Sequence, residues 1–191
     1  ANTHPVKQGN VGAGTGATVG KLAGVRHAMK GGLGSASRRL PNGLVVGAIV
    51  AVNAVGEVRD PATGKVLAGV RDEHGQIRDI RSLMIEQGTS SILPGTNTTI
   101  AVVASNANFT KAQANKVAQM AHNGLARTIF PVHTMHDGDT IFAAATGGVD
   151  ASVDLVGTLS ADVLAEAVVN AIIAAETAGG IPAYRDLRPQ A

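Results

Sequence analysis

Short apolar runs alternate along the chain with longer amphipathic segments, and this alternation predicts the secondary structure. Residues 44–53, LVVGAIVAVN, are apolar and β-branched, which is typical of a buried central strand that ends at Asn53. Similar runs over 100–105 and 140–146 predict two further strands. An asparagine at the end of a strand usually begins a turn, here with Gly56, but its amide can also donate to a developing oxyanion.

Two later segments carry apolar residues at helical spacing. Thr110 and Gln113 form a capping-box pattern, which predicts a helix that stops near residues 123–124. Ser160 is the predicted cap of a second helix, which the glycine pair at 179–180 ends. We interpret both apolar stripes as core-facing. Strand, helix, strand and helix around one central sheet indicate a single α/β layered domain over residues 1–191.

Two segments lack such clear periodicity. Residues 57–97 are charged and rich in turn-forming residues, which predicts a hairpin followed by a mobile connector. Residues 9–37 are rich in glycine, and Lys21 lies among these small neighbours. Small neighbours let the backbone approach the lysine ammonium closely, although a solvated loop lysine is the more frequent case.

Composition narrows the classes of function. A chain of 191 residues with 45% apolar content can bury a substantial core, so we expect a globular domain. A formal charge of +2 and 2% aromatic content argue against a nucleic-acid partner. The absence of cysteine leaves Ser, Thr, Lys or a carboxylate for covalent catalysis. No apolar run reaches the roughly 18 residues of a membrane helix, so we expect no membrane partner and take the cytoplasm as the default.

The motif Asn97-Thr98-Thr99-Ile100 lies where an irregular stretch with Pro94 and Gly95 gives way to a strand. A hydroxyl residue at such a boundary has a fixed position, although a threonine at a strand start is common.

A second polar cluster, HTMHDGDT, ends at the strand predicted over 140–146. His133, His136 and Asp137 could be read as a metal site, because imidazole and carboxylate are metal ligands. A plain polar turn is the simpler interpretation. In a third interpretation, Asp137 and Asp139 precede a strand beside the threonine motif and set protonation states there.

Taken in order, these pieces resemble the L-aminopeptidase/D-esterase family, which includes the β-peptidyl aminopeptidases and the nylon-oligomer hydrolase. The matching pieces are Gly20-Lys21, the strand ending at Asn53, Asn97-Thr98-Thr99-Ile100, Gly124-Leu125-Ala126-Arg127-Thr128, Pro131-Val132-His133 and Asp137-Gly138-Asp139-Thr140-Ile141-Phe142. The resemblance extends from about Gly9 onward. It implies an αββα sandwich of the N-terminal-nucleophile hydrolase type, with ornithine acetyltransferase-like connectivity.

The resemblance also implies a precursor that cuts its own backbone between Asn97 and Thr98, giving pieces 1–97 and 98–191. Thr98 would then be the nucleophile, and its new α-amino group, with a reference pKa of about 7.7 to 8.0, would take the hydroxyl proton. By the same match, Lys21 would hold and polarise the hydroxyl, and Asn53 would contribute to the oxyanion hole. Asp137 and Asp139 would position the nucleophile and its amine. The two histidines of that loop receive no role, and neither a cofactor nor a metal is expected.

The expected activity is hydrolysis of amide bonds in short peptides, amino-acid amides or ω-amide oligomers. Three alternatives stay open: an acyltransferase similar to the ornithine acetyltransferases, a non-catalytic ligand-binding or assembly protein, and a metal-dependent hydrolase. Relatives carry a sizeable segment before the glycine-rich loop, so we expect that the chain is cut at its start or that another chain supplies this part. The family and the alanine-rich helices suggest a homo-oligomer.

Overall fold

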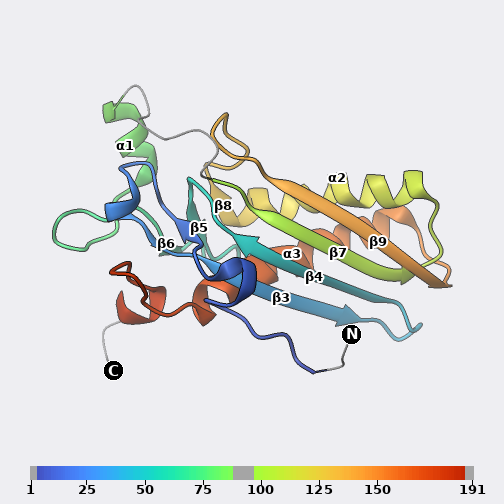
Figure 1. The fold of residues 1–191 in the computed structure, drawn as a ribbon. Coiled ribbons are helices and arrows are strands. Elements are labelled where there is room, and N and C mark those ends of the chain that lie inside the picture. Colours follow the sequence, from blue (N-terminus) through green and yellow to red (C-terminus); the bar gives the residue numbers. More distant parts are fainter. Residues whose placement is uncertain (1–3, 88–96, 188–191) are drawn as a thin grey trace.

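The computed structural model describes residues 4–87 and 97–187. Its main sheet has the strand order β3-β4-β7-β9 (Figure 1). The strands are β3 (Gly32–Arg39), β4 (Val45–Val52), β7 (Ile100–Ala107) and β9 (Thr140–Val149). β3, β4 and β7 pair antiparallel, whereas β7 and β9 pair parallel. The three strands predicted from apolar runs are therefore confirmed, and they are neighbours in one sheet.

Two long helices, α2 (Lys111–Thr128) and α3 (Val153–Ala174), pack together on one side of this sheet (Figure 1). The crossover from β7 to β9 runs through α2, as parallel neighbours require. By length and composition α3 could cross a membrane, but most of it is buried against α2, β3 and β4 as a core helix. The capping box at Thr110 is present and begins α2 as predicted.

Both predicted helix boundaries based on glycine are wrong. α2 continues through Gly124 to Thr128 because this glycine lets α3 approach closely: a Cβ there would lie 2.5 Å from the carbonyl oxygen of Ala161. α3 ends at Ala174, before the glycine pair at 179–180.

The predicted cap of α3 is also wrong. Ser152 is the N-cap, and its side chain accepts a hydrogen bond from the backbone N–H of Leu155. Ser160 is buried inside the helix, two turns further on.

The glycine-rich segment forms more regular structure than its sequence indicates. It contains β1 (Thr18–Val19), β2 (Met29–Lys30), two short 3-10 turns at Gly12–Gly14 and Val25–His27, and the edge strand β3. Glycine in β3 serves helix packing, because a Cβ on Gly34 would lie 2.0 Å from the carbonyl oxygen of Ala167 in α3.

A smaller sheet has the order β6-β5-β8. Its strands are β5 (Glu57–Arg59), β6 (Val66–Ala68) and β8 (Ile129–Phe130), and β5 with β6 forms the predicted hairpin. The short helix α1 (Ile80–Gln87) was not predicted, and a final 3-10 turn spans Tyr184–Leu187. The rest of the predicted connector, 88–96, lies outside the described residues.

The main sheet has one covered face and one open face. The helices cover the first, whereas on the second Ile100, Val102 and Phe142 are 49%, 38% and 58% exposed. The described residues thus form one helical layer and one sheet layer of the expected αββα arrangement, and the apolar open face lies where a second sheet would pack.

Candidate active site

Thr98 lies where three chain segments meet at one end of the main sheet. Its backbone N–H donates to the carbonyl oxygen of Asn53 at 2.9 Å, which extends the pairing of β4 with β7. Asn97 forms a parallel bridge with Asp137, which extends the pairing of β7 with β9. Strand register therefore brings the two sequence motifs and the end of the first predicted strand to the same place.

The carbonyl group between Asn97 and Thr98 accepts two hydrogen bonds. The Thr98 hydroxyl donates to the Asn97 oxygen at 2.6 Å, and the Gly138 N–H donates to the same oxygen at 2.9 Å. Gly138 also borders the hydroxyl itself, since a Cβ at this position would lie 2.7 Å from Thr98 Oγ1. Glycine between the two aspartates therefore leaves room for the Thr98 side chain.

Lys21 is buried on the β4 side of the site, with 5% of its surface exposed. Its Nζ donates to Asn53 Oδ1 at 2.8 Å and to the Asn53 carbonyl oxygen at 3.4 Å. Burial lowers the pKa of Lys21 to about 8, and the negative charge of Asp137 opposes this shift. An amine with this pKa changes its charge near neutral pH, which is typical of functional sites.

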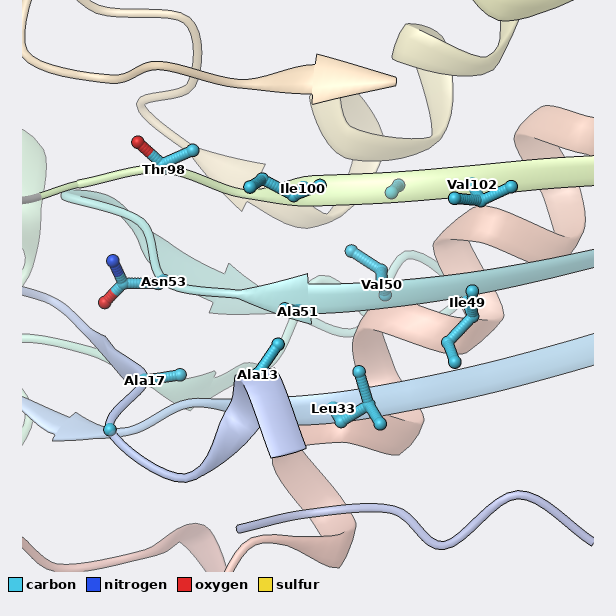
Figure 2. A pocket seen from close by; sticks show the side chains of 12 residues that line it. Ala13, Ala17, Leu33, Ile49, Val50, Ala51, Asn53, Thr98, Ile100 and Val102 are labelled. Carbon is cyan, nitrogen blue, oxygen red and sulfur yellow. The ribbon is translucent and has the colours of Figure 1, made fainter. Parts of the chain in front are cut away.

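The amide of Asn53 is oriented by what its oxygen accepts. Oδ1 receives hydrogen bonds from Lys21 Nζ and, at 3.1 Å, from the backbone N–H of Thr18. In Figure 2 the nitrogen of this amide lies on the side of Thr98. The arrangement presents a donor towards the nucleophile candidate, as an oxyanion-hole residue requires.

Asp137 and Asp139 fix the loop on the β9 side of the site. Asp137 Oδ1 accepts from the backbone N–H of Val55 at 3.2 Å, and its Oδ2 accepts from the hydroxyl of Thr134 at 2.6 Å. Asp139 Oδ1 accepts from the backbone N–H of Thr99 at 2.9 Å. The two carboxylates thus bond to the residues that surround Thr98.

The metal-site interpretation finds no support within residues 4–87 and 97–187, where no group of three His, Asp or Glu side chains is arranged to hold an ion. His133 instead bonds through Nδ1 to Asp139 Oδ2 at 2.9 Å. His136 lies in the same loop as His133, and its carbonyl oxygen accepts a hydrogen bond from the side-chain Nδ2 of Asn97 at 3.4 Å.

An open pocket of about 450 Å³ lies beside Thr98 on the open face of the sheet (Figure 2). Its lining is mostly apolar and comes from the glycine-rich segment and strands β3, β4 and β7. The lining residues are Ala13, Gly16, Ala17, Leu33, Ile49, Val50, Ala51, Asn53, Thr98, Ile100, Ala101 and Val102.

All five predicted site residues therefore lie around one point: Lys21 and Asn53 on the β4 side, Asp137 and Asp139 on the β9 side, and Thr98 between them. Nothing in the sequence indicated that Gly138 borders the Thr98 hydroxyl or that His133 bonds to Asp139. In the sequence, Asp-Gly-Asp is typical of a polar turn, and the steric role of its glycine is visible only from the position of Thr98.

Comparison with known proteins identifies the family. The sequence model of Peptidase family S58 matches residues 1–184. The chain belongs to this family. An aminopeptidase of Mycobacterium leprae, named as uncharacterised, is 42% identical over 209 residues, which cover 97% of this chain and 54% of that protein. The 6-aminohexanoate-oligomer endohydrolase of an Agromyces strain is 34% identical over 148 residues, which cover 75% of this chain and 41% of that enzyme.

Solved structures of similar proteins give the same fold. One is the L-aminopeptidase D-Ala-esterase/amidase of Ochrobactrum anthropi, which is described as a new variant of the Ntn-hydrolase fold. The match has a TM-score of 0.64 at 25% sequence identity, and it covers 95% of this chain and 48% of the Ochrobactrum chain. A β-aminopeptidase of Burkholderia sp. matches with a TM-score of 0.58 at 25% sequence identity, and the match covers 91% of this chain and 48% of the Burkholderia chain. The family resemblance and the fold class expected from the sequence are thus confirmed. This S58 chain spans about half the length of the relatives that it matches.

Proposed function

We propose that this S58 chain carries the catalytic residues of an autoprocessing amide hydrolase whose nucleophile is Thr98. The observation that carries the proposal is the contact of the Thr98 hydroxyl with the carbonyl group of Asn97, at 2.6 Å between the oxygens. A second donor, the Gly138 N–H, bonds to the same carbonyl oxygen. Nucleophile, carbonyl and oxyanion donor are therefore adjacent before any cleavage.

Self-cleavage would proceed by an N-to-O acyl shift. Thr98 Oγ1 attacks the Asn97 carbonyl carbon, and negative charge develops on the oxygen that Gly138 N–H already contacts. The C–N bond then breaks, the nitrogen takes up the hydroxyl proton, and an ester joins Asn97 to the threonine oxygen. Water hydrolyses this ester, which leaves a carboxylate on Asn97 and a free amine and hydroxyl on Thr98.

The mature site would use the same groups on an external amide. Thr98 Oγ1 attacks the substrate carbonyl while the α-amino group takes its proton and later gives it to the departing amine. Water then releases the acyl group from the threonine. The bond from Thr98 N to the Asn53 carbonyl supports this role, because it would hold the new amine beside the hydroxyl. Lys21 and the Asn53 amide would stabilise the developing charges, and the two aspartates would hold the surrounding backbone.

Substrates of this site would be short amides with an apolar acyl part. The apolar lining of the pocket beside Thr98 supports this class, which includes small peptides, amino-acid amides and ω-amide oligomers. Two relatives of the chain, an aminopeptidase and a 6-aminohexanoate-oligomer endohydrolase, bear names that agree with this class. We also propose a homo-oligomeric, cytoplasmic enzyme in which another chain covers the open face of the sheet, because three large apolar side chains are exposed there.

Intact mass measurement tests the proposal. The purified protein should separate into two pieces that meet at Asn97 and Thr98, whereas Thr98→Ala should stay whole and Thr98→Ser should still be cut, because serine keeps the hydroxyl. The cut protein should then release amine from a panel of amino-acid amides and short oligoamides. A wild-type chain that remains whole after prolonged incubation would contradict the proposal and favour a binding or assembly role.

A further inference from the structure

A line of hydrogen bonds leads away from the candidate nucleophile to the surface of α2. The backbone N–H of Thr99 donates to Asp139 Oδ1 at 2.9 Å. The other oxygen of this carboxylate accepts from His133 Nδ1 at 2.9 Å, and His133 Nε2 lies 3.2 Å from Nδ1 of His122. Both histidines lie outside the set of groups that the proposed reaction uses.

His133 is held by its backbone as well as by its ring. Its φ is 56°, in the left-handed region that few residues other than glycine adopt, although histidine tolerates it better than most. In this conformation its own N–H also donates to Asp139 Oδ2, at 3.3 Å. Two donors from one residue thus converge on a carboxylate of which only 2% is exposed.

The ring contacts define where protons must be. Because the carboxylate accepts, His133 carries a proton on Nδ1, and its Nε2 accepts from the Nδ1–H of His122 when both rings are neutral. An added proton on His133 reverses the second bond, so that His122 becomes the acceptor. Burial, together with the charge of a protonated His133, lowers the pKa of His122. The titratable group that opposes this shift is Asp139.

Cleavage would make this line more important. Before it, Thr98 is held from the upstream side by the contacts of Asn97 with Asp137 and Gly138. A cut after Asn97 removes that covalent restraint. The next residue downstream that is held in place is Thr99, whose N–H donates to Asp139 and whose carbonyl oxygen accepts from the N–H of Thr140. The nucleophile would then sit one residue from the carboxylate that His133 fixes.

We propose that His133, supported by His122, is a positioning residue that holds Asp139 and through it the N-terminal threonine of the cut enzyme. This inference rests on the proposed nucleophile Thr98. Because the pair acts after the upstream restraint is lost, its removal affects turnover more than self-cleavage.

Steady-state kinetics with the wild type, His133→Gly and the control His74→Gly test this inference. Glycine removes the ring but tolerates the left-handed backbone, and His74 is an exposed histidine in a distant turn. We expect His133→Gly to be cut, to lose about 10- to 100-fold in kcat with little change in KM, and to regain activity when free imidazole is added. His122→Leu should show a smaller loss of the same kind, and His74→Gly neither loss nor rescue.

Three outcomes would overturn the inference, and they can be told apart. Unchanged kcat in a cut His133→Gly enzyme, or a loss that imidazole does not restore, contradicts the positioning role while leaving Thr98 as the nucleophile. A wild-type chain that neither cuts itself nor hydrolyses amides contradicts the nucleophile assignment and this inference together. Imidazole is also added to the wild-type enzyme, so that any hydrolysis of the substrate by imidazole itself can be subtracted from the measured rates.

Discussion

The two sides of Thr98 differ in how their charged groups are accommodated. On the β4 side a lysine is buried at 5% exposure, and its desolvation lowers its pKa to about 8. On the β9 side Asp137 and Asp139 accept hydrogen bonds from backbone and side-chain donors of the same loop and its neighbours. Burying a charge opposes folding, whereas satisfying a carboxylate with several donors favours it. The buried charge of the β4 side therefore lowers the free energy of unfolding, whereas the hydrogen-bonded carboxylates of the β9 side raise it.

Replacing Lys21 gives the largest expected change and separates activity from stability. Lys21→Met should slow self-cleavage by about 100- to 1000-fold, since it removes a buried positive charge that bonds to Asn53, the residue whose carbonyl oxygen holds the N–H of Thr98. It should also raise the free energy of unfolding by about 1 kcal/mol, because methionine fills a similar volume without a charge. The stability is measured by denaturant titration in a Thr98→Ala background, so that both chains are uncut.

The pH dependence of this stability gain has a defined sign. The folded-state pKa of Lys21 is lowered from 10.5 to about 8, so the unfolded chain binds the extra proton more readily between these values. The cost of the buried charge is complete below pH 8 and disappears as the pH rises towards 10.5. The advantage of Lys21→Met should therefore be largest below pH 8 and fade above it. An advantage that grows with pH would contradict the assigned burial cost.

Removing Asp139 should lower activity and stability together. Asp139→Ala leaves the N–H of Thr99 and two donors of His133 without their acceptor, so we expect a loss of about 3 kcal/mol in the free energy of unfolding. Turnover of any cut enzyme should fall about 100-fold because the threonine loses its anchor. Thermal unfolding and kcat are the measurements, and an enzyme of normal stability would show that the carboxylate is not a structural anchor.

A methyl group on Gly138 should affect processing with little effect on folding. Its Cβ would lie 2.7 Å from Thr98 Oγ1, so Gly138→Ala should displace the hydroxyl and slow self-cleavage about 10- to 100-fold. Gly47→Ala is the matched control, because a Cβ at Gly47 meets only ordinary contacts in the same sheet. The rates are followed by gel densitometry of the two pieces. Equal rates in both variants would remove Gly138 from the reaction.

The smallest expected effect is the pH dependence of the self-cleavage rate. An uncut chain has no α-amino group at residue 98, so the pH dependence of its cleavage reports Lys21 without interference from the amine. If the charged lysine is required, the wild-type rate should fall about tenfold per pH unit well above pH 8, while the slow rate of Lys21→Met stays flat. A rate that rises through pH 8 would instead make neutral Lys21 the base.

Where the sequence predicted correctly, the signal was local. Apolar, β-branched runs marked β4, β7 and β9, and the capping box marked the first residue of α2. β3 was missed because its sequence, GLGSASRR, shows glycines whose purpose is the close approach of α3. Ser152 and Ser160 are both plausible caps locally, and only the packing of the longer helix decides between them.

The candidate site was predicted in a different way, since local signals alone left its residues open to simpler interpretations. The family resemblance brought Lys21, Asn53, Thr98, Asp137 and Asp139 together in advance, and the structure places them around one point. Nothing local distinguishes a buried Lys21 from a solvated one, because the burial comes from segments distant in sequence. The contact of His133 with His122 joins a loop to a helix face across 11 residues, and no motif encodes it.

The open face of the sheet has a consequence for how such an enzyme diversifies. Ile100 and Val102 belong both to that face and to the wall of the pocket beside Thr98. A polypeptide that packs on this face would therefore also line the pocket, whereas the proposed catalytic groups all belong to the chain described here. Under the proposed function, changes in the covering polypeptide would alter the selectivity of the pocket and leave the proposed catalytic residues of this chain unchanged.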